Sequence, residues 1–261
     1  MHELLLNVWP LKRLISQIPN AITLLNLLSG AAALVLASRG YMPLACGFIG
    51  IAAVFDFFDG LVARLLKVHS SIGEQLDSLA DMVSFGLAPS FLLFQHLTQL
   101  HEAAGHLTAL ERMPAGRLLG MSLSFLIAVF AALRLARFNI DARQKDAFIG
   151  VPTPAIALLF VAAMMLYYLD PQMQQMRLLS SPWLWQAAAV AGSLLMVLPL
   201  HMFSLKFKDL SWQNNQIRYV FVGFSLILLV LLQAMALPLI IIWYILLSVV
   251  YHIFEPKFSR L

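Results

Sequence analysis

Long apolar runs alternate with short polar segments along almost the whole chain. Each run is continuous and has the length that a helix needs to cross a bilayer, which is not the residue-by-residue alternation of membrane β-strands. The pattern therefore predicts an all-α, polytopic membrane protein. Its eight expected spans are residues 20–38, 43–65, 74–97, 117–138, 151–169, 184–203, 217–235 and 238–254.

The two ends of the chain depart from this simple pattern. Before the first span, apolar residues recur at helical spacing beside Trp9, Lys12 and Arg13, which predicts an amphipathic helix lying at the membrane surface over residues 1–18. The last two spans are separated only by the corner Ala236-Leu237-Pro238. The sequence leaves open whether these two spans are separate helices or one broken element.

Composition agrees with a membrane protein. Hydrophobic residues make up 61% of the 261 residues and charged residues 11%, whereas about 25% of a soluble domain is charged. The formal net charge of +4 is modest. Since the basic residues gather at the ends of the spans, the expected partners are anionic lipid headgroups and not nucleic acid.

Lysine and arginine are divided unevenly between the two sides of the predicted spans. Of the 17 such residues, 13 fall on the side of the termini and 4 on the other. Cytoplasmic segments carry the excess of positive charge. We therefore expect both termini on the cytoplasmic side of a membrane, which would be the inner membrane of a bacterium. The four on the opposite side are Arg39, Arg112, Arg117 and Arg177.

Four aspartates interrupt the apolar pattern close to that cytoplasmic side. Asp56 with Asp59, and Asp77 with Asp81, are three or four residues apart, so each pair shares one face of a helix. A carboxylate at the centre of a membrane helix costs roughly 2.5–3.5 kcal/mol, so something must compensate. Two acidic faces on adjacent helices would offer the hard oxygen ligands of divalent metal ions. The ion path of a cation transporter is the alternative.

Small residues and an arginine accompany the aspartates. Gly60 and Ala63 follow the first pair near the same face, and Gly73 precedes the second pair, where small side chains let a ligand approach the backbone closely. Arg64 lies further toward the cytoplasm, where it is placed to meet a phosphate. This combination indicates a metal-bridged pyrophosphate site and is not what a cation path requires.

The order Asp-x2-Asp-Gly-x2-Ala-Arg-x8-Gly-x3-Asp-x3-Asp, which runs from Asp56 to Asp81, resembles the signature of the CDP-alcohol phosphotransferases without a gap or substitution. The resemblance implies a catalytic core of six membrane helices, which would occupy residues 19–203, and typically a homodimer. Residues 204–261 would then hold two additional helices and a short cytoplasmic tail.

The same resemblance implies roles for the residues of the signature. Two divalent cations, Mg²⁺ or Mn²⁺, would be held by Asp56, Asp59, Asp77 and Asp81, and Asp81 would also be the catalytic base. The CDP-lipid site would be lined by Gly60, Ala63, Arg64 and Gly73.

Three segments bear on the alcohol that accepts the phosphatidyl group. Residues 71–89, 133–139 and 148–155 resemble the phosphatidylserine synthase branch of that family. This likeness implies CDP-diacylglycerol and L-serine as substrates and CMP as a product. If these segments do not determine the acceptor, the alternative acceptors are glycerol 3-phosphate and inositol.

Two arginines near the end of the fourth span are the candidates for binding the acceptor. Arg134 and Arg137 are three residues apart, so two guanidinium groups could bind a phosphate or an amino-acid carboxylate, with the Asn139 amide beside them. The same arginines could instead extend to anionic headgroups at the membrane surface. From the residues alone, both interpretations stay open.

Overall fold

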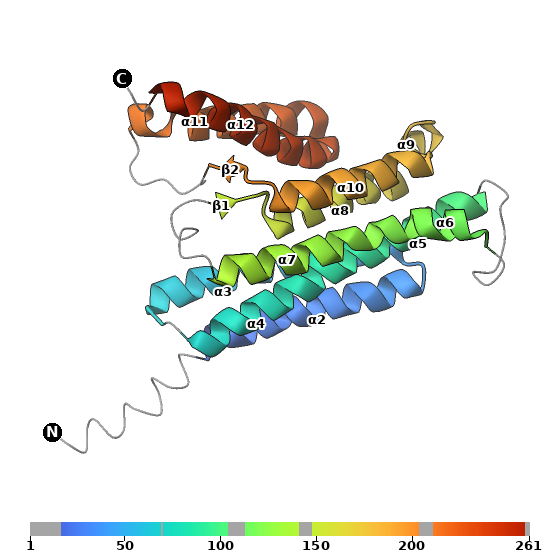
Figure 1. Ribbon diagram of the computed structural model, residues 1–261, viewed down its shortest axis with the longest axis horizontal. Helices are drawn as coiled ribbons and strands as arrows, with labels where there is room; N and C mark the ends of the chain where they lie inside the picture. The colour runs from blue at the N-terminus through green and yellow to red at the C-terminus, as the bar shows by residue number, and fades with distance from the viewer. Residues whose placement is uncertain (1–16, 69, 104–112, 141–147, 204–210, 259–261) are drawn as a thin grey trace, which may run out of the picture.

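Antiparallel helices, packed side by side in an elongated bundle, make up almost all of the protein (Figure 1). The computed structural model describes residues 17–68, 70–103, 113–140, 148–203 and 211–258. Its elements, in chain order, are α2 (Ile18–Ser38), α3 (Met42–Leu66), α4 (Ser71–Asp81), the π-helix η1 (Met82–Leu87), α5 (Ala88–Ala103), α6 (Ala115–Ser122), the 3-10 turn η3 (Leu123–Phe125), α7 (Leu126–Ile140), β1 (Phe148–Ile149), α8 (Thr153–Leu169), α9 (Pro171–Gln175), α10 (Pro182–Val197), β2 (His201–Met202), α11 (Trp212–Leu232), the 3-10 turn η5 (Gln233–Met235) and α12 (Ala236–Phe258).

Length and composition identify the helices that can cross a membrane. Within the described residues, five helical segments are long and apolar enough, namely Ile18–Ser38, Met42–Leu66, Ser71–Ala103, Ala115–Ile140 and Trp212–Leu232. Three shorter apolar helices cover Thr153–Leu169, Pro182–Val197 and Ala236–Tyr251. The chain is therefore a polytopic membrane protein built from helices, and each predicted span overlaps one of these eight segments.

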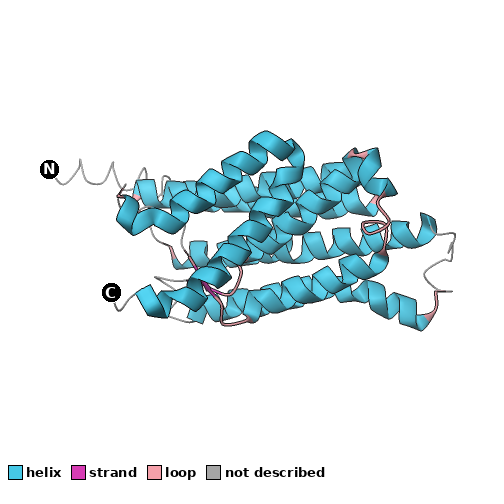
Figure 2. Ribbon diagram, turned by 90° about the horizontal axis from the view of Figure 1, so that it is seen from above, coloured by secondary structure: helices cyan, strands magenta, loops and turns pink. Residues whose placement is uncertain are grey.

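The sixth predicted span, 184–203, extends too far at its carboxyl end. Helix α10 ends at Val197, and Leu198 has an extended backbone with φ −62° and ψ 145°. Pro199 explains the ending, because a proline disfavours helical conformation at the residue before it. The chain then continues into β2, which pairs antiparallel with β1. Figure 2 shows this short pair among the helices, and the architecture of the described residues is otherwise all-helical, as the sequence predicts.

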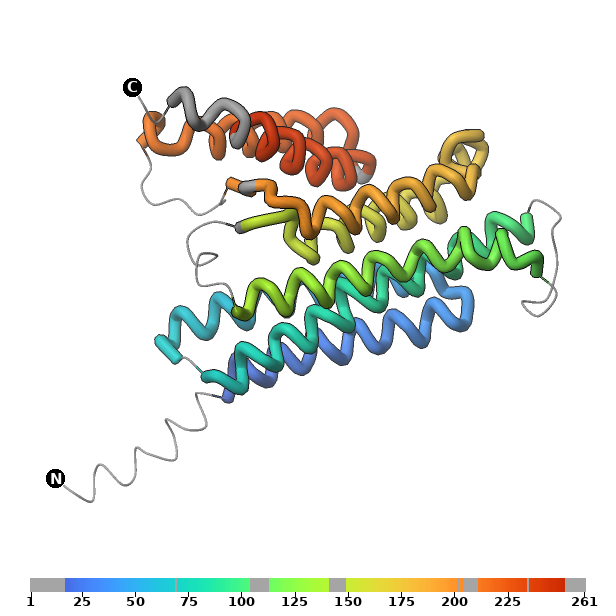
Figure 3. The backbone as a smooth tube through the Cα atoms, in the orientation of Figure 1, coloured from blue at the N-terminus to red at the C-terminus, as the bar shows by residue number. Residues whose placement is uncertain are grey.

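The corner between the last two spans separates two distinct helices. Gln233 begins the turn η5 with a left-handed φ of 48°, which ends α11. In the tube view, α11 and α12 lie alongside each other and run in opposite directions (Figure 3). The sequence left open whether this region is two helices or one broken element, and the structure shows two helices.

The predicted surface helix over residues 1–18 lies outside the described residues, except for Gln17 and Ile18. Helix α2 begins at Ile18, with Pro19 in its first turn, a position where the missing N–H of proline costs no helical hydrogen bond.

Helix α2 packs directly on the π-helix η1. A Cβ added to Gly30 would lie 2.8 Å from the Ser84 Cα atom, so only glycine lets the two backbones approach this closely. The buried Ser84 hydroxyl also donates to the carbonyl oxygen of Asn26, at 3.1 Å. This contact joins the start of the chain to the segment that follows Asp81.

Candidate metal centre and adjoining pocket

Three of the four aspartates form a close cluster. Carboxylate oxygens of Asp56 and Asp59, from the last turns of α3, and of Asp77, from α4, all lie within 4.8 Å of one another. Asp59 is buried, and the other two are half-buried. The i, i+3 spacing on α3 places its two aspartates on one face, as the sequence predicts.

The fourth aspartate lies beside this cluster. Asp81 is buried, and its carboxyl group is within hydrogen-bonding reach of that of Asp56. It also interacts electrostatically with Asp77. The structure therefore brings together all four aspartates of the signature.

The charge of the cluster fits divalent cations. Among the described residues, no ion pair joins any of the four carboxylates to a lysine or arginine. Two like charges 4 Å apart repel by about 1 kcal/mol in water and about 4 kcal/mol near a protein surface. A compact group of hard oxygen atoms with no such ion pair is a suitable ligand set for ions such as Mg²⁺, Mn²⁺ or Ca²⁺.

Helix α2 supplies hydrogen-bond donors that the sequence analysis missed. Thr23 Oγ1 donates to Asp59 Oδ2 at 2.7 Å, and Asn26 Nδ2 donates to Asp81 Oδ1 at 3.3 Å. Both donors are buried. The signal was present in the sequence, since Asn20, Thr23 and Asn26 recur every three residues on one face of an apolar helix. Such donors orient ligating carboxylates and influence metal affinity.

A pocket of about 450 Å³ opens beside the cluster, and Asp59 and Asp77 form part of its wall. It also contains every residue expected from the signature at the CDP-lipid site. The remaining lining residues come from α2, the segment between α3 and α4, and the start of α4. The full lining is Pro19, Asn20, Thr23, Asp59, Gly60, Ala63, Arg64, Lys67, Val68, Ser70, Gly73, Glu74 and Asp77.

The two glycines of the pocket have different roles. A Cβ added to Gly60 would meet nothing within 4 Å, so this part of the wall is open to a ligand. A Cβ added to Gly73 would lie 2.8 Å from Asn20 Oδ1. The absence of a side chain at residue 73 therefore leaves room for the Asn20 side chain of α2 at the edge of the pocket.

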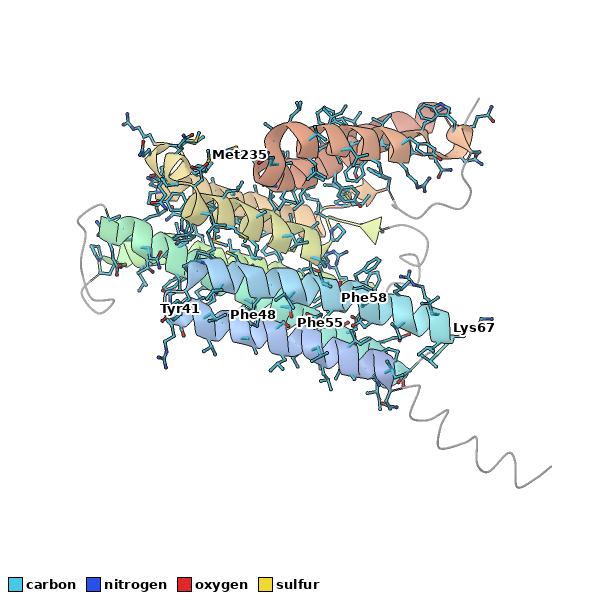
Figure 4. All side chains as sticks on the ribbon, turned by 180° about the vertical axis from the view of Figure 1, so that it is seen from behind. Tyr41, Phe48, Phe55, Phe58, Lys67 and Met235 are labelled. Carbon is cyan, nitrogen blue, oxygen red and sulfur yellow. The ribbon has the colours of Figure 1, made fainter. Side chains whose placement is uncertain are left out.

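Basic residues lie at one end of this pocket. Arg64 is exposed, and its Nε donates to the carbonyl oxygen of Gly60 at 2.9 Å. Lys67 follows at the end of α3, and Figure 4 labels it at the end opposite Tyr41. A phosphate entering the pocket would meet positive charge at this end before it reaches the aspartates.

The residues proposed from the sequence to bind the acceptor lie in different environments in the structure. Arg134 is 7% exposed and its Nη1 donates to Thr153 Oγ1 at 3.1 Å, whereas Arg137 and Asn139 are exposed. Asn139 Nδ2 instead donates to Ser78 Oγ at 3.0 Å, which links α7 to α4. The two guanidinium groups expected to act together therefore differ in environment, and only that of Arg134 lies in the protein interior.

Thr153 is a second residue that the sequence analysis missed. It is fully buried as the first residue of α8, between Pro152 and Pro154. Proline is favoured in the first helical turn, which explains why α8 begins at this point. The sequence did not indicate that the threonine between the prolines accepts a hydrogen bond from Arg134.

Known proteins resemble this chain over the part that carries the site. The sequence model of the CDP-alcohol phosphatidyltransferase family matches residues 16–203. This segment includes α2 to β2, and therefore the aspartates, the pocket and Arg134.

Three similar proteins are CDP-diacylglycerol–serine O-phosphatidyltransferases. One from Helicobacter pylori is 36% identical over 150 residues, which is 57% of each chain. One from Bacillus subtilis is 33% identical over 144 residues, 55% of this chain and 73% of the relative. One from Methanocaldococcus jannaschii is 34% identical over 149 residues, 57% of this chain and 61% of the relative. The match thus spans little more than half the length of the Helicobacter relative.

Proposed function

We propose that this chain, which belongs to the CDP-alcohol phosphatidyltransferase family, transfers the phosphatidyl group of CDP-diacylglycerol to L-serine and releases CMP. The observation that carries the proposal is the cluster of Asp56, Asp59 and Asp77 at the wall of a pocket lined by the rest of the signature. The choice of serine is supported by the similar proteins, which are CDP-diacylglycerol–serine O-phosphatidyltransferases.

Asp56, Asp59, Asp77 and Asp81 would hold two divalent cations, Mg²⁺ or Mn²⁺. Bound ions would polarise the phosphoryl oxygens and neutralise charge on the departing CMP. Four carboxylates balance the charge of two such ions, so the occupied centre would be near neutral before the lipid binds. Thr23 and Asn26 keep two of these carboxylates in fixed orientations.

The pocket would hold the CDP headgroup while the acyl chains remain in the bilayer. Gly60 and Ala63 leave room for the pyrophosphate, and Arg64 and Lys67 provide positive charge at the basic end. Because Gly60 leaves its part of the wall open, a ligand can reach the backbone beside Asp59.

Asp81 would act as the general base. It accepts the proton of the serine hydroxyl, and the hydroxyl oxygen attacks the phosphorus that carries the diacylglycerol. The new P–O bond to serine forms as the pyrophosphate P–O bond breaks, and the electron pair of that bond leaves with CMP. No covalent enzyme intermediate is needed, since the acceptor oxygen attacks the lipid directly.

Arg134 is the proposed anchor for the serine carboxylate. Its guanidinium group is buried and interacts electrostatically with Asp81, and among the described residues its Nε has no hydrogen-bond partner. A carboxylate bound there would satisfy this buried donor. Arg137 and Asn139, which are exposed, would have weaker roles at the entrance to the site.

The proposal also includes the placement of the protein in its membrane. All eight apolar helices would cross the bilayer, with the aspartates and both termini on the cytoplasmic side, and residues 19–203 would form the catalytic core. This orientation is supported by the excess of lysine and arginine at that side. A homodimer, as the family resemblance implies, would be the functional unit.

The test is CMP release by the purified protein in detergent, with CDP-diacylglycerol and Mg²⁺ or Mn²⁺, and with serine, glycerol 3-phosphate or inositol as acceptor. Release with serine alone is expected. Release only with another alcohol would overturn the assignment of serine but keep the family chemistry. If no acceptor supports release while the protein transports cations, the enzymatic assignment fails.

A further inference from the structure

Asn26 adjoins the proposed metal centre but lies outside both the aspartate signature and the lining of the pocket. Its side chain is fully buried on α2, and its Nδ2 donates to Asp81 Oδ1 at 3.3 Å. This hydrogen bond gives a role to the nitrogen of the amide. The oxygen of the same amide has no role in the signature or in the pocket.

The amide oxygen of Asn26 is a buried acceptor. Among the residues that the structure describes, no group donates a hydrogen bond to Oδ1. An ionised carboxylate only accepts hydrogen bonds, so the amide keeps its nitrogen toward Asp81 and its oxygen directed elsewhere. A buried carbonyl oxygen without a partner is unfavourable. Oδ1 is therefore available to bind a cation or a donor.

A divalent cation suits this oxygen better than a donor from a substrate. The side chain of Asn26 is 0% exposed and does not line the pocket, so a molecule as large as a lipid headgroup or an amino acid does not reach it. Oδ1 and Nδ2 are bonded to one carbon atom, so the oxygen lies in the immediate neighbourhood of Asp81. Carbonyl oxygens, including that of asparagine, are ordinary ligands of hard divalent cations.

The backbone of Asn26 is fixed where it passes the aspartates. The Ser84 hydroxyl donates to its carbonyl oxygen at 3.1 Å, and Gly30 lets α2 contact Ser84 closely. The amide is thus held in place on a rigid element. It is also uncharged, so it adds a ligand atom without disturbing the charge balance between four carboxylates and two divalent ions.

We propose that Asn26 Oδ1 is a direct ligand of the divalent ion bound next to Asp81. The amide then has two functions: its nitrogen orients a carboxylate, and its oxygen binds the ion. This inference rests on the proposed function, because it adds a residue of α2 to the metal centre described there.

The direct test replaces the amide by a soft ligand. Asn26→Cys, made in a Cys46→Ala background, leaves one thiol in the chain. A thiolate binds soft ions such as Cd²⁺ in preference to Mg²⁺, and the bond between them produces an absorption band in the ultraviolet. Titration of the purified protein in detergent with Cd²⁺ should produce this band, and an excess of Mg²⁺ should not remove it.

Ala33→Cys in the same Cys46→Ala background is the matched control. Ala33 is also fully buried on α2, seven residues beyond Asn26, which is about 10 Å along a helix. Its thiol should give no band with Cd²⁺. The absence of a band in Asn26→Cys, or equal bands in both variants, would overturn the proposal.

A double-mutant cycle separates direct binding of the ion from the hydrogen bond to Asp81, and it needs no thiol. The affinity for Mn²⁺ is measured without substrate, from the electron paramagnetic resonance of the free ion. Asn26→Leu keeps the size of the side chain and should weaken Mn²⁺ binding about 10-fold, both in the wild type and in an Asp81→Ala background. A substitution without effect in the Asp81→Ala background would show that Asn26 acts only through the carboxylate, and the proposal would fail.

The same measurements separate this inference from the proposed function. Binding of Mn²⁺ by the wild-type protein tests the metal centre, and CMP release tests the transfer reaction, both independently of Asn26. Mn²⁺ binding that is insensitive to residue 26 would refute the inference and leave the metal centre intact. A wild-type protein that binds no divalent cation would refute both.

Discussion

The four aspartates of the site are supported in different ways by single residues around them. Asp59 and Asp81 are buried and each accepts a hydrogen bond from α2, whereas Asp56 and Asp77 are half-buried. This difference predicts that substitutions at the four positions, and at their donors on α2, will affect chemistry and metal binding unequally.

Asp81→Asn should abolish CMP release while the protein still folds and inserts. The amide keeps the size of the side chain but cannot accept the serine proton, and loss of a positioned general base costs about 100-fold to 10,000-fold in rate. The measurement is CMP release together with gel filtration in detergent. Glu102→Gln, an exposed residue near the end of α5, is the control and should be fully active. Near-normal turnover by Asp81→Asn would remove its assigned role.

Thr23→Val should raise the concentration of Mg²⁺ or Mn²⁺ needed for half-maximal activity. The substitution removes the 2.7 Å hydrogen bond to Asp59 with little change in volume. Loss of a partner of a metal ligand lowers affinity by about 10-fold to 100-fold. Thr23→Ser keeps the hydroxyl, so it should retain the wild-type metal requirement. Identical metal titration curves for the valine and serine variants would argue against this role.

At the scale of elements, the pair β1–β2 connects the start of α8 to the end of α10. Gly150, next to β1, has a positive φ of 79°, and its N–H donates to the carbonyl oxygen of Leu200 at 2.8 Å. A Cβ added there would collide with the carbonyl oxygen of Met196. The position therefore requires glycine both for its backbone conformation and for space.

Gly150→Ala should lower thermal stability and, through α8, weaken the acceptor site. A non-glycine residue in this backbone region costs about 1–3 kcal/mol before the collision is counted. The melting temperature in detergent and the KM for serine are the quantities to measure. Gly47→Ala is the control, because a Cβ added to Gly47 meets nothing within 4 Å. A Gly150→Ala protein as stable as the control would contradict the geometry.

The sequence predicted the helices well because their signals are local. Apolar runs located the eight apolar helices of the described part of the chain, and the i, i+3 spacing of Asp56 and Asp59 placed both carboxylates on one face. What it could not predict depends on contacts between distant segments. Thr153 reaches Arg134 across 19 residues, and Thr23 reaches Asp59 across 36. The spacing of Arg134 and Arg137 likewise could not reveal that only one of them would be buried.

At the scale of the whole molecule, successive helices run in opposite directions, so the turns between them lie in two sets at opposite ends of the bundle. The start of α4 lies at the end of the bundle that holds the pocket, and the turn between α9 and α10 lies at the other end (Figure 1). The proposed orientation assigns the first end to the cytoplasm. The single cysteine, Cys46, is buried, so engineered cysteines can report on each end.

Ser71→Cys and Arg177→Cys, each made in a Cys46→Ala background, should react differently with a membrane-impermeant maleimide in intact cells freed of their outer membrane. Both positions are exposed. The cysteine at 177 should be labelled in intact cells, and that at 71 only after permeabilisation, because the basic side faces the cytoplasm. Labelling at residue 71 in intact cells, and at residue 177 only after permeabilisation, would show that the proposed orientation is wrong.

The π-helix after Asp81 has a consequence for how this sequence can change over evolution. A π-type turn contains more residues than an α-type turn, and each residue of an α-helix advances the chain by about 100° around its axis. Asp77 and Asp81 precede the π-helix, and the buried residues Leu93 and Leu97 follow it. Residues 82–87 therefore determine the angle around the helix axis between these two pairs. Deleting one residue here would allow a regular α-helix, but either the aspartates or the packed face of α5 would be turned away. A change in the length of this stretch is therefore excluded whatever residues it contains, because no side chain can restore the angle that is lost.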